Sequence, residues 1–204
     1  MVAPSNTGAP LLSTLLQGVA EIAPDLDRPV AGMTLDSNSV VPGALFCALS
    51  GSRRHGMDFA AAAVARVELG IPAVCVPELS HCLSAVSGRF HGDPSQTLDV
   101  IGITGTNGKT SVCQFIAQAL GDDMPCGIVG TLGYGFPDAL AATGFTTPDA
   151  IRSQAILAEL KSKGAGVVAM EISSHALDQG RAAGIAVDTA VFTNLSRDHL
   201  DYHA

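Results

Sequence analysis

The chain has 204 residues, of which 47% are hydrophobic, and it carries a formal net charge of −8. This length and apolar content suffice for one large or two small domains with a buried core. The acidic balance argues against nucleic acid as a partner, because no run of basic residues is longer than Arg53-Arg54. No apolar run approaches the about 18 residues of a membrane span, and residues 11–16 lack the basic flank of a signal peptide. We therefore expect a globular protein with no membrane insertion.

The cysteines are odd in number, at five, and none belongs to a C-x-x-C pair. Most of them stand within apolar runs such as residues 73–76. This pattern is typical of buried, reduced thiols rather than of a disulfide framework, and it favours a cytoplasmic location.

Short apolar runs alternate with helical patterns along the chain. Strands are predicted near 31–35, 44–49, 71–76, 99–104, 127–131, 167–172 and 189–193. Helices are predicted near 10–22, 57–70, 80–91, 109–121, 149–163 and 175–183. Such alternation indicates an α/β fold. Turn-forming residues at 92–95 interrupt it, so we place a boundary there between domains of residues 1–94 and 95–204.

A glycine-rich loop follows the fourth predicted strand. It runs from Gly105 to Gly108 and leads into Lys109 and Thr110 where a helical pattern begins. The backbone N–H groups of such a turn, the helix N-terminus and the lysine together suit a polyphosphate, and the threonine hydroxyl suits Mg²⁺. The strict motif has glycine at position 103, where this chain has Ile103. The alternative is a turn in which the glycines serve only the turn, but it gives the lysine no packing role.

A carboxylate, Glu171, stands near the end of the predicted strand 167–172. Because ligands of parallel sheets bind at the carboxyl ends of the strands, we expect Glu171 beside the phosphate loop, where it can ligate Mg²⁺ or its water shell. A buried glutamate needs a partner. A metal ion is one possibility, and structural capping or pairing is the other.

The last predicted strand leads into a segment that contains Asp198, His199, Asp201 and His203. Its position after a parallel strand again indicates the ligand crevice. A lone histidine in such a loop is more often an ordinary hydrogen-bonded residue. The expected convergence of His199 with the glutamate and the lysine at one sheet edge favours a functional role.

Further polar segments suit a substrate. Thr146 and Thr147 precede a helix whose first N–H groups are free, and Arg181 offers a planar cation beside Gln179. A helix cap and a surface arginine explain these residues equally well.

In the N-terminal part, residues 35–39 end a strand in polar groups, and the loop 51–56 offers backbone amides and two arginines. Such a loop suits a diphosphate, although many solvated loops have this composition.

Three motifs closely resemble those of the Mur ligases: GITGTNGKTS at 102–111, MEISSHALDQGR at 170–181 and FTNLSRDHLDYH at 192–203. The resemblance extends over essentially the whole chain. It implies an α/β fold, with a Rossmann-like N-terminal domain that binds a UDP-sugar and a truncated P-loop ATPase domain that has a mostly parallel sheet. It also implies an ATP- and Mg²⁺-dependent amide ligase of peptidoglycan synthesis. Such a ligase adds a third amino acid, meso-diaminopimelate or L-lysine, to UDP-N-acetylmuramoyl-L-alanyl-D-glutamate through an acyl phosphate.

The resemblance also implies roles for individual residues. Those that bind ATP are Gly105, Thr106, Asn107, Gly108, Lys109, Thr110 and Ser111. The catalytic residues are Lys109, Glu171 and His199, and the metal ligands are Thr110, Glu171 and His199. Those that bind the UDP-muramoyl substrate are Leu35, Ser37, Ser52, Arg53, Arg54, Thr146, Thr147, Ser173, Gln179 and Arg181.

Members of this family have three domains and more than twice this many residues. We therefore expect an N-terminal fragment that lacks the family's carbamylated lysine and its amino-acid domain, and that has no turnover alone. An unpaired sheet edge near 189–194 is expected to lower its stability or to promote self-association. We expect the full-length protein to be a monomer. The alternatives are a non-catalytic module that binds the UDP-muramoyl peptide or a nucleotide, and a folylpolyglutamate-type ligase, against which residues 31–94 argue.

Overall fold

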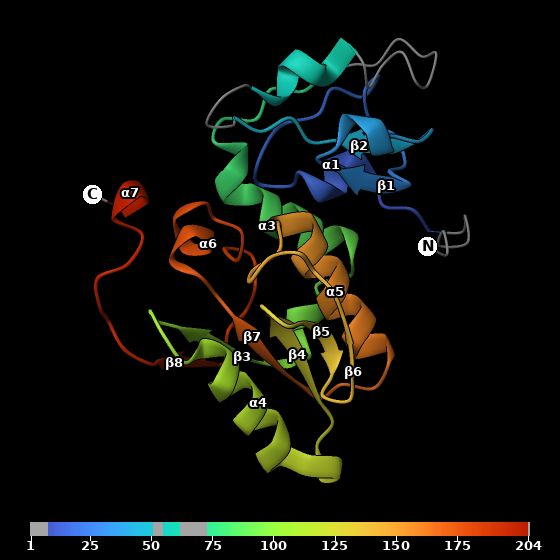
Figure 1. The fold of residues 1–204 in the computed structure, drawn as a ribbon. Coiled ribbons are helices and arrows are strands. Elements are labelled where there is room, and N and C mark those ends of the chain that lie inside the picture. The colour runs from blue at the N-terminus through green and yellow to red at the C-terminus, as the bar shows by residue number, and fades with distance from the viewer. Residues whose placement is uncertain (1–7, 51–54, 62–72, 204) are drawn as a thin grey trace.

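The computed structural model describes residues 8–50, 55–61 and 73–203 (Figure 1). Its main element is a six-stranded sheet in the order β6-β5-β4-β7-β3-β8. The strands are β3 (Asp99–Thr104), β4 (Cys126–Gly130), β5 (Gly133–Phe136), β6 (Ala139–Ala141), β7 (Val167–Glu171) and β8 (Thr189–Phe192). β4, β7, β3 and β8 pair in parallel, and β5 and β6 are antiparallel. The structure thus confirms the predicted α/β fold with a mostly parallel sheet.

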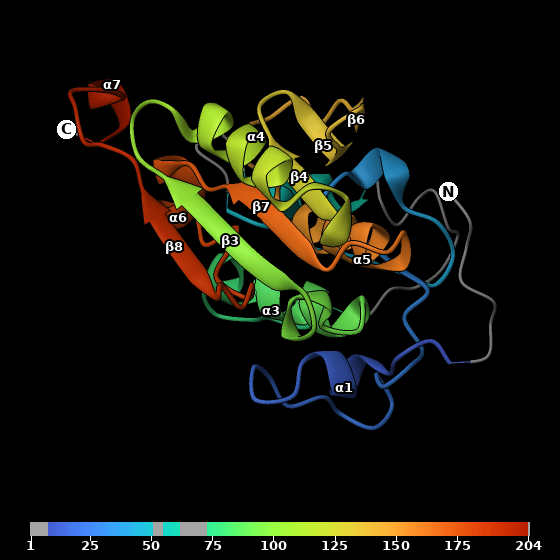
Figure 2. The same cartoon turned by 90° about the horizontal axis from the view of Figure 1, so that it is seen from below.

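Helices cover both faces of this sheet. α4 (Lys109–Leu120) lies on one face, and α5 (Ala150–Ser162) and α6 (Ser174–Asp178) lie on the other (Figures 1 and 2). Along β7, Val168 and Met170 pack beneath α5, whereas Val167 and Ala169 pack beneath α4. Burial of an aliphatic side chain of this size stabilises the fold by about 1.5–3 kcal/mol. The buried central strands therefore hold the residues at their ends in fixed positions.

The helices begin in different ways. Asp149 caps α5, because its carboxylate accepts hydrogen bonds from the N–H groups of Ile151 and Arg152, both at 2.9 Å. Ser173 caps α6 by accepting from the N–H of Ala176 at 3.2 Å. α4 begins at a glycine with no side-chain cap. Its first N–H groups are therefore left without a capping side chain.

The N-terminal part contains a two-stranded parallel sheet of β1 (Gly32–Thr34) and β2 (Ala44–Phe46), with the helices α1 (Leu12–Leu15) and α3 (Leu79–Phe90). Val86 of α3 packs in one apolar cluster with α1. α3 also packs along α5, where the side-chain amide of Gln154 donates to the carbonyl of Ser84 at 3.2 Å. In the described part of the chain, the remaining helices are α7 (Leu200–His203) and short 3-10 turns at Ser37–Ser39, Gly56–Phe59, Pro94–Gln96 and Gly121–Asp123.

The structure corrects several predicted elements. The helix predicted over 10–22 is limited to α1, because the chain turns at Gly18, whose φ is 73°. The strand predicted over 71–76 is not found in its described part, because residues 73–76 pair with none of the described strands; their valines pack against the α1 cluster instead, and residues 71–72 lie outside the described chain. The helix predicted over 175–183 ends at Asp178, two residues before Gly180, whose φ is 66°.

Two strands were not predicted, and one helix is only partly described. The hairpin of β5 and β6 escaped prediction because Gly133 and Gly135 break the apolar alternation that marks a strand. The helix predicted over 57–70 starts with the 3-10 turn Gly56–Phe59, and its residues 62–70 lie outside the described part of the chain.

All five cysteines are free thiols. Cys47, Cys113 and Cys126 are buried as predicted, but Cys75 is exposed because its segment is not part of a sheet. Within the described ranges, no helix combines the length and the apolar composition that crossing a membrane requires.

Candidate active site

A polar cleft of about 270 Å³ opens where the central strands end. It is lined by Thr106, Asn107, Gly108, Lys109, Thr110, Thr131, Thr146, Glu171, Ser173 and His199. The register of the sheet explains this convergence, because Ile103 of β3 pairs with Glu171 of β7 and with Val191 of β8. The segments that follow parallel strands therefore meet at one edge. All of the lining residues except Thr131 are among the site residues predicted from the sequence.

The phosphate loop joins β3 to α4 through two glycines in left-handed conformations. Gly105 has a φ of 126° and Gly108 a φ of 84°. A β-carbon at Gly105 would overlap the hydroxyl of Thr193, so the loop passes that residue too closely for any side chain. The N–H groups at the start of α4 have neither a capping side chain nor an acceptor within the helix. This end of α4 therefore attracts anions.

Ile103 stands where the strict phosphate-loop motif has glycine. It is fully buried within β3 and packs in the cluster beneath α4. β3 continues through Ile103 to Thr104, and the loop turns at Gly105.

Lys109 folds back over the phosphate loop. Its amine donates hydrogen bonds to the carbonyl oxygens of Gly105 at 2.6 Å and Thr106 at 3.1 Å. The other two lysines of the chain, Lys161 and Lys163, lie at the exposed end of α5. Lys109 is therefore the one lysine of the chain that lines the cleft.

Glu171 is only 1% exposed, yet its carboxylate faces the cleft. Its Oε1 accepts hydrogen bonds from the Thr110 hydroxyl at 2.9 Å and from the Thr131 N–H at 3.0 Å. Among the described residues, no basic side chain forms an ion pair with it. A β-carbon at Gly130 would overlap the carboxylate, so glycine is required beside it. The sequence reasoning expected Glu171 at this edge, and its closest partners are neutral hydroxyl and amide groups.

The oxygen atoms of Glu171 and Thr110 are suitable ligands for a magnesium ion. A buried carboxylate without a cation is costly, and Mg²⁺ prefers carboxylate and hydroxyl oxygens such as those of Glu171 and Thr110. No group of three acidic, histidine or cysteine side chains in the described ranges could hold a metal ion by itself. This fits Mg²⁺, which usually takes one or two carboxylates and completes its shell with water and phosphate oxygens.

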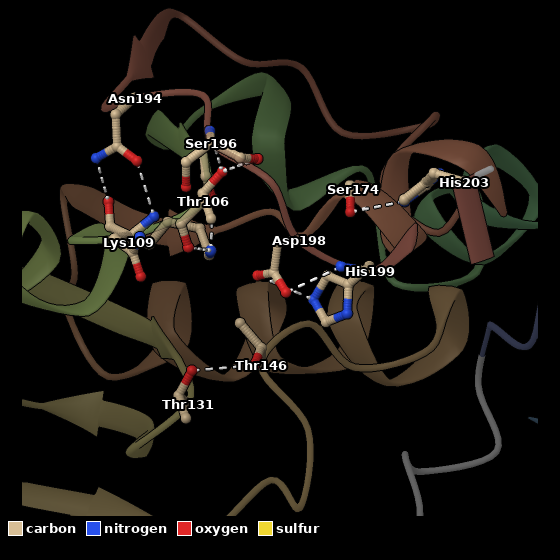
Figure 3. Close-up of polar contacts among 12 residues, drawn as sticks. Thr106, Lys109, Thr131, Thr146, Ser174, Asn194, Ser196, Asp198, His199 and His203 are labelled. Carbon is tan, nitrogen blue, oxygen red and sulfur yellow. Dashed lines mark hydrogen bonds and ion pairs between the residues drawn. The ribbon is translucent and has the colours of Figure 1, made fainter. Parts of the chain in front are cut away.

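Thr131, which the sequence reasoning missed, holds Glu171 from the neighbouring strand end. Besides its N–H, its hydroxyl lies 3.2 Å from Oε2 of the carboxylate and 3.0 Å from the hydroxyl of Thr146 (Figure 3). Thr131 follows β4 directly, so the rule that selected Glu171, a polar residue at the carboxyl end of a parallel strand, could have found it.

The expected substrate residues near the cleft are linked to one another. Thr147 is 1% exposed; its hydroxyl donates to the carbonyl of Glu171 at 2.9 Å and accepts from the N–H of Ser173 at 3.0 Å. Arg181 donates to the carbonyl of Thr147 at 3.0 Å and to the side-chain oxygen of Gln179 at 2.8 Å. Only Thr146 and Ser173 of this set line the cleft.

His199 reaches the cleft from the segment between β8 and α7. Its backbone is left-handed, with a φ of 51°, and its Nε2 lies 3.6 Å from a carboxylate oxygen of Asp198 (Figure 3). The ring packs edge-on against His175, with 4.6 Å between the ring centroids. Burial, followed by the neighbouring His199 and His203, lowers the pKa of His175. The imidazole group of His175 is thereby favoured in its neutral form.

The two described candidates of the N-terminal part, Leu35 and Ser37, lie outside the cleft. Leu35 packs in the cluster of Cys47 and Leu83, and Ser37 is buried at the start of a 3-10 turn. Neither lines the cleft. Ser52, Arg53 and Arg54 lie outside the described residues.

Comparison with known proteins gives one family. Residues 103–204 match the Mur ligase middle domain. The chain is 46% identical over 216 residues to the UDP-N-acetylmuramoyl-L-alanyl-D-glutamate--2,6-diaminopimelate ligase of Alkalilimnicola ehrlichii, with 94% of this chain and 43% of the relative covered. It is 52% identical over 195 residues to the ligase of the same name from Pseudomonas aeruginosa, with 87% and 40% covered.

A solved structure of a UDP-N-acetylmuramoyl-L-alanyl-D-glutamate--2,6-diaminopimelate ligase has the same fold. It is 31% identical, with a TM-score of 0.81 over 97% of this chain and 42% of that chain. The chain thus spans about two fifths of the length of the relatives that it matches. From the matched domain and these relatives, we conclude that the chain belongs to the Mur ligase family.

Proposed function

We propose that this chain supplies the ATP-binding site of a ligase that joins diaminopimelate to UDP-N-acetylmuramoyl-L-alanyl-D-glutamate. The names of the similar ligases support the two substrates. The observation that carries the proposal is the cleft itself, in which a buried carboxylate with no ion pair among the described residues lies beside the uncapped start of α4, together with Lys109. An anionic polyphosphate with its metal ion supplies the charges that such a cleft lacks.

Each side of the cleft has its own part in the reaction. The N-terminus of α4 and the amine of Lys109 bind the phosphates of ATP and stabilise the negative charge that moves during transfer. Glu171 and Thr110 would hold a magnesium ion, which would supply positive charge to neutralise the phosphate oxygens. His199, which also lines the cleft, is assigned to the acceptor side, where it would help to hold a second ion.

The proposed reaction has two steps. A carboxylate oxygen of the muramoyl dipeptide forms a bond to the γ-phosphorus of ATP, and the bond from that phosphorus to the β-phosphate oxygen breaks to release ADP. The amine of diaminopimelate then forms a bond to the acyl carbon, loses a proton, and displaces inorganic phosphate. Thr146 and Ser173 present hydroxyls to this side of the cleft, and we assign them, with Thr147, Gln179 and Arg181, to the muramoyl dipeptide.

The uridine end of the substrate is assigned to the N-terminal part. Leu35 and Ser37 follow β1, and the loop of Ser52, Arg53 and Arg54 supplies backbone amides and cations suited to a diphosphate. The nucleotide sugar would then extend from this part towards the cleft.

Substitution of Lys109 by alanine tests the ATP site. Calorimetry with a non-hydrolysable ATP analogue and Mg²⁺ should show at least a roughly tenfold loss of affinity, since a charge-assisted phosphate contact contributes about 1.5–3 kcal/mol. Lys161→Ala, at the exposed end of α5, is the matched control and should bind as the wild type does. Unchanged affinity of the Lys109→Ala variant, with unaltered thermal unfolding, would remove Lys109 from the site.

A further inference from the structure

The segment 193–196, which follows β8, forms a hydrogen-bonded brace on the phosphate loop. Asn194 makes its central contacts: its carbonyl accepts from the N–H of Thr106 at 2.9 Å, and its side-chain oxygen accepts from the N–H of Asn107 at 3.1 Å. The side-chain amide donates in turn to the carbonyl of Asn107 at 3.0 Å (Figure 3). One side chain thus satisfies both backbone groups of a loop residue, as a neighbouring strand would.

Its neighbours complete the brace. The hydroxyl of Thr193 donates to the carbonyl of Asn107 at 2.7 Å, and the N–H of Ser196 donates to the hydroxyl of Thr106 at 2.9 Å. The backbone of Gly105 also lies so close that an added β-carbon would be 2.8 Å from the carbonyl oxygen of Asn194. Several separate hydrogen bonds and one close backbone approach therefore hold the loop against the brace.

The brace changes the expected role of the loop N–H groups. The turn from Gly105 to Gly108 was expected to point its N–H groups at a polyphosphate. Those of Thr106 and Asn107 are instead used by Asn194. The anion is therefore left to the N-terminus of α4 and to Lys109, whose positions depend on the path of the braced loop.

We propose that Asn194 is a positioning residue of the nucleotide site, which holds the phosphate loop in the shape that binds ATP. The inference rests on the proposed function. A glycine-rich loop loses conformational entropy when it is ordered, and a loop that is ordered in advance does not lose it during binding. His199, which lines the cleft, follows Asn194 by five residues. The segment after β8 therefore joins the nucleotide side of the site, through the brace, to the acceptor side, through His199.

Two variants of this chain and one control test the role of Asn194. Asn194→Ala removes the side-chain bonds, and Asn194→Asp keeps the size and the acceptor but cannot donate to the carbonyl of Asn107. The control is Asp188→Ala. Asp188 makes a similar clip at the opposite end of β3 and β8, where its carboxylate accepts from the N–H of Val100 at 2.8 Å and its own N–H donates to the carbonyl of Val100 at 2.9 Å.

Amide hydrogen exchange and calorimetry with an ATP analogue and Mg²⁺ give separate readouts. Asn194→Ala should exchange the amide of Asn107, which loses its acceptor, about tenfold faster than the wild type, and that of Thr106, whose backbone acceptor remains, by a smaller factor. Both variants lose the bond to the carbonyl of Asn107 and should bind the analogue about tenfold more weakly. Asp188→Ala should speed exchange at Val100 and leave the affinity unchanged.

The inference is overturned if the amide of Asn107 exchanges at the wild-type rate in Asn194→Ala, or if both variants bind the analogue as the wild type does. It is also overturned if Asp188→Ala weakens binding as much as they do, because the effect would then be one of general stability. A wild-type chain that does not bind the analogue would contradict the proposed function, and with it the nucleotide role of Asn194. Exchange at the two amides would still show whether the brace holds the loop.

Discussion

Substitution of Glu171 by glutamine separates the function of this residue from its effect on stability. The change removes the negative charge and keeps the size of the side chain. If Oε1 remains an oxygen, it still accepts from Thr110 and from the N–H of Thr131. The new amide can donate to the hydroxyl of Thr131, which can in turn donate to that of Thr146. No buried polar group is left without a partner.

The expected change in stability follows from these contacts. Three hydrogen bonds to a charged carboxylate become hydrogen bonds to a neutral amide, and each falls from about 1.5–3 to about 0.5–1.5 kcal/mol. Against this loss of about 3 kcal/mol stands the desolvation of a buried charge, which costs several kcal/mol when no cation offsets it. We expect the free energy of unfolding of Glu171→Gln to equal that of the wild type or to exceed it by up to about 2 kcal/mol.

Binding should respond in the opposite direction. Loss of the carboxylate removes the one anionic side chain that lines the cleft, so Mg²⁺-dependent affinity for an ATP analogue should fall at least about tenfold. Urea unfolding at pH 7 and calorimetry with and without Mg²⁺ measure the two effects. Glu159→Gln is the control: Glu159 pairs with Lys163 at 2.7 Å on the surface of α5, and its loss should lower stability slightly and leave binding intact.

Two results would refute this reasoning. A Glu171→Gln variant that is destabilised by more than about 2 kcal/mol would show that the carboxylate holds the fold together through its charge. A variant that keeps the wild-type dependence of binding on Mg²⁺ would show that Glu171 is not the metal ligand.

Four further predictions concern other features of the chain. Gly130→Ala should displace the carboxylate of Glu171 and lower the free energy of unfolding by about 1.5–3 kcal/mol in urea titrations, whereas Gly166→Ala, with open space around it, should change little; equal effects would contradict the close packing at Gly130. Burial raises the pKa of Cys47 and Cys113 to about 12, so peptide mass spectrometry should find them unalkylated at pH 8 while the exposed Cys75 reacts. Because these thiols hold their protons more tightly in the folded state, stability should fall as the pH rises above their ordinary value of 9.0, and a rise would contradict the shift. In NMR titrations of the whole chain with UDP-N-acetylmuramoyl-dipeptide, signals of residues 35–39 and 52–54 should shift without ATP; shifts confined to residues after Gly102 would contradict the uridine assignment.

Much of the sheet could be predicted because its central strands are continuous apolar runs that end in polar residues. β3 and β7 are of this kind, and the position of Glu171 at the end of β7 followed from the rule for parallel sheets. The strand prediction was wrong for residues 73–76, which are also an apolar run. Composition cannot distinguish an apolar segment that pairs with a strand from one that only packs against a cluster.

The sequence could predict which residues form the candidate site but not which contacts they make. Nothing in the local sequence indicates that Lys109 bends back to the carbonyl of Gly105, or that Asn194 binds a loop 87 residues away. Such contacts depend on the register between strands, which propensity and periodicity do not encode. Thr131 could be predicted only in part: the sequence shows that it follows an apolar strand, but not that it binds Glu171.

α3 packs into two apolar clusters at once. Val86 packs with the side chains of α1, whereas Leu83 packs with Ala150 at the start of α5. Ser84 of α3 is fully buried, and its carbonyl accepts a hydrogen bond from the side-chain amide of Gln154 of α5. If the parts on either side of 92–95 were separated, α3 would be left with an unmatched apolar stripe, and the buried amide of Gln154 in α5 would lose one of its acceptors and keep the carbonyl of Gly184. The two parts are therefore expected to melt as one cooperative unit, and the helix they share makes their relative orientation part of the folded state.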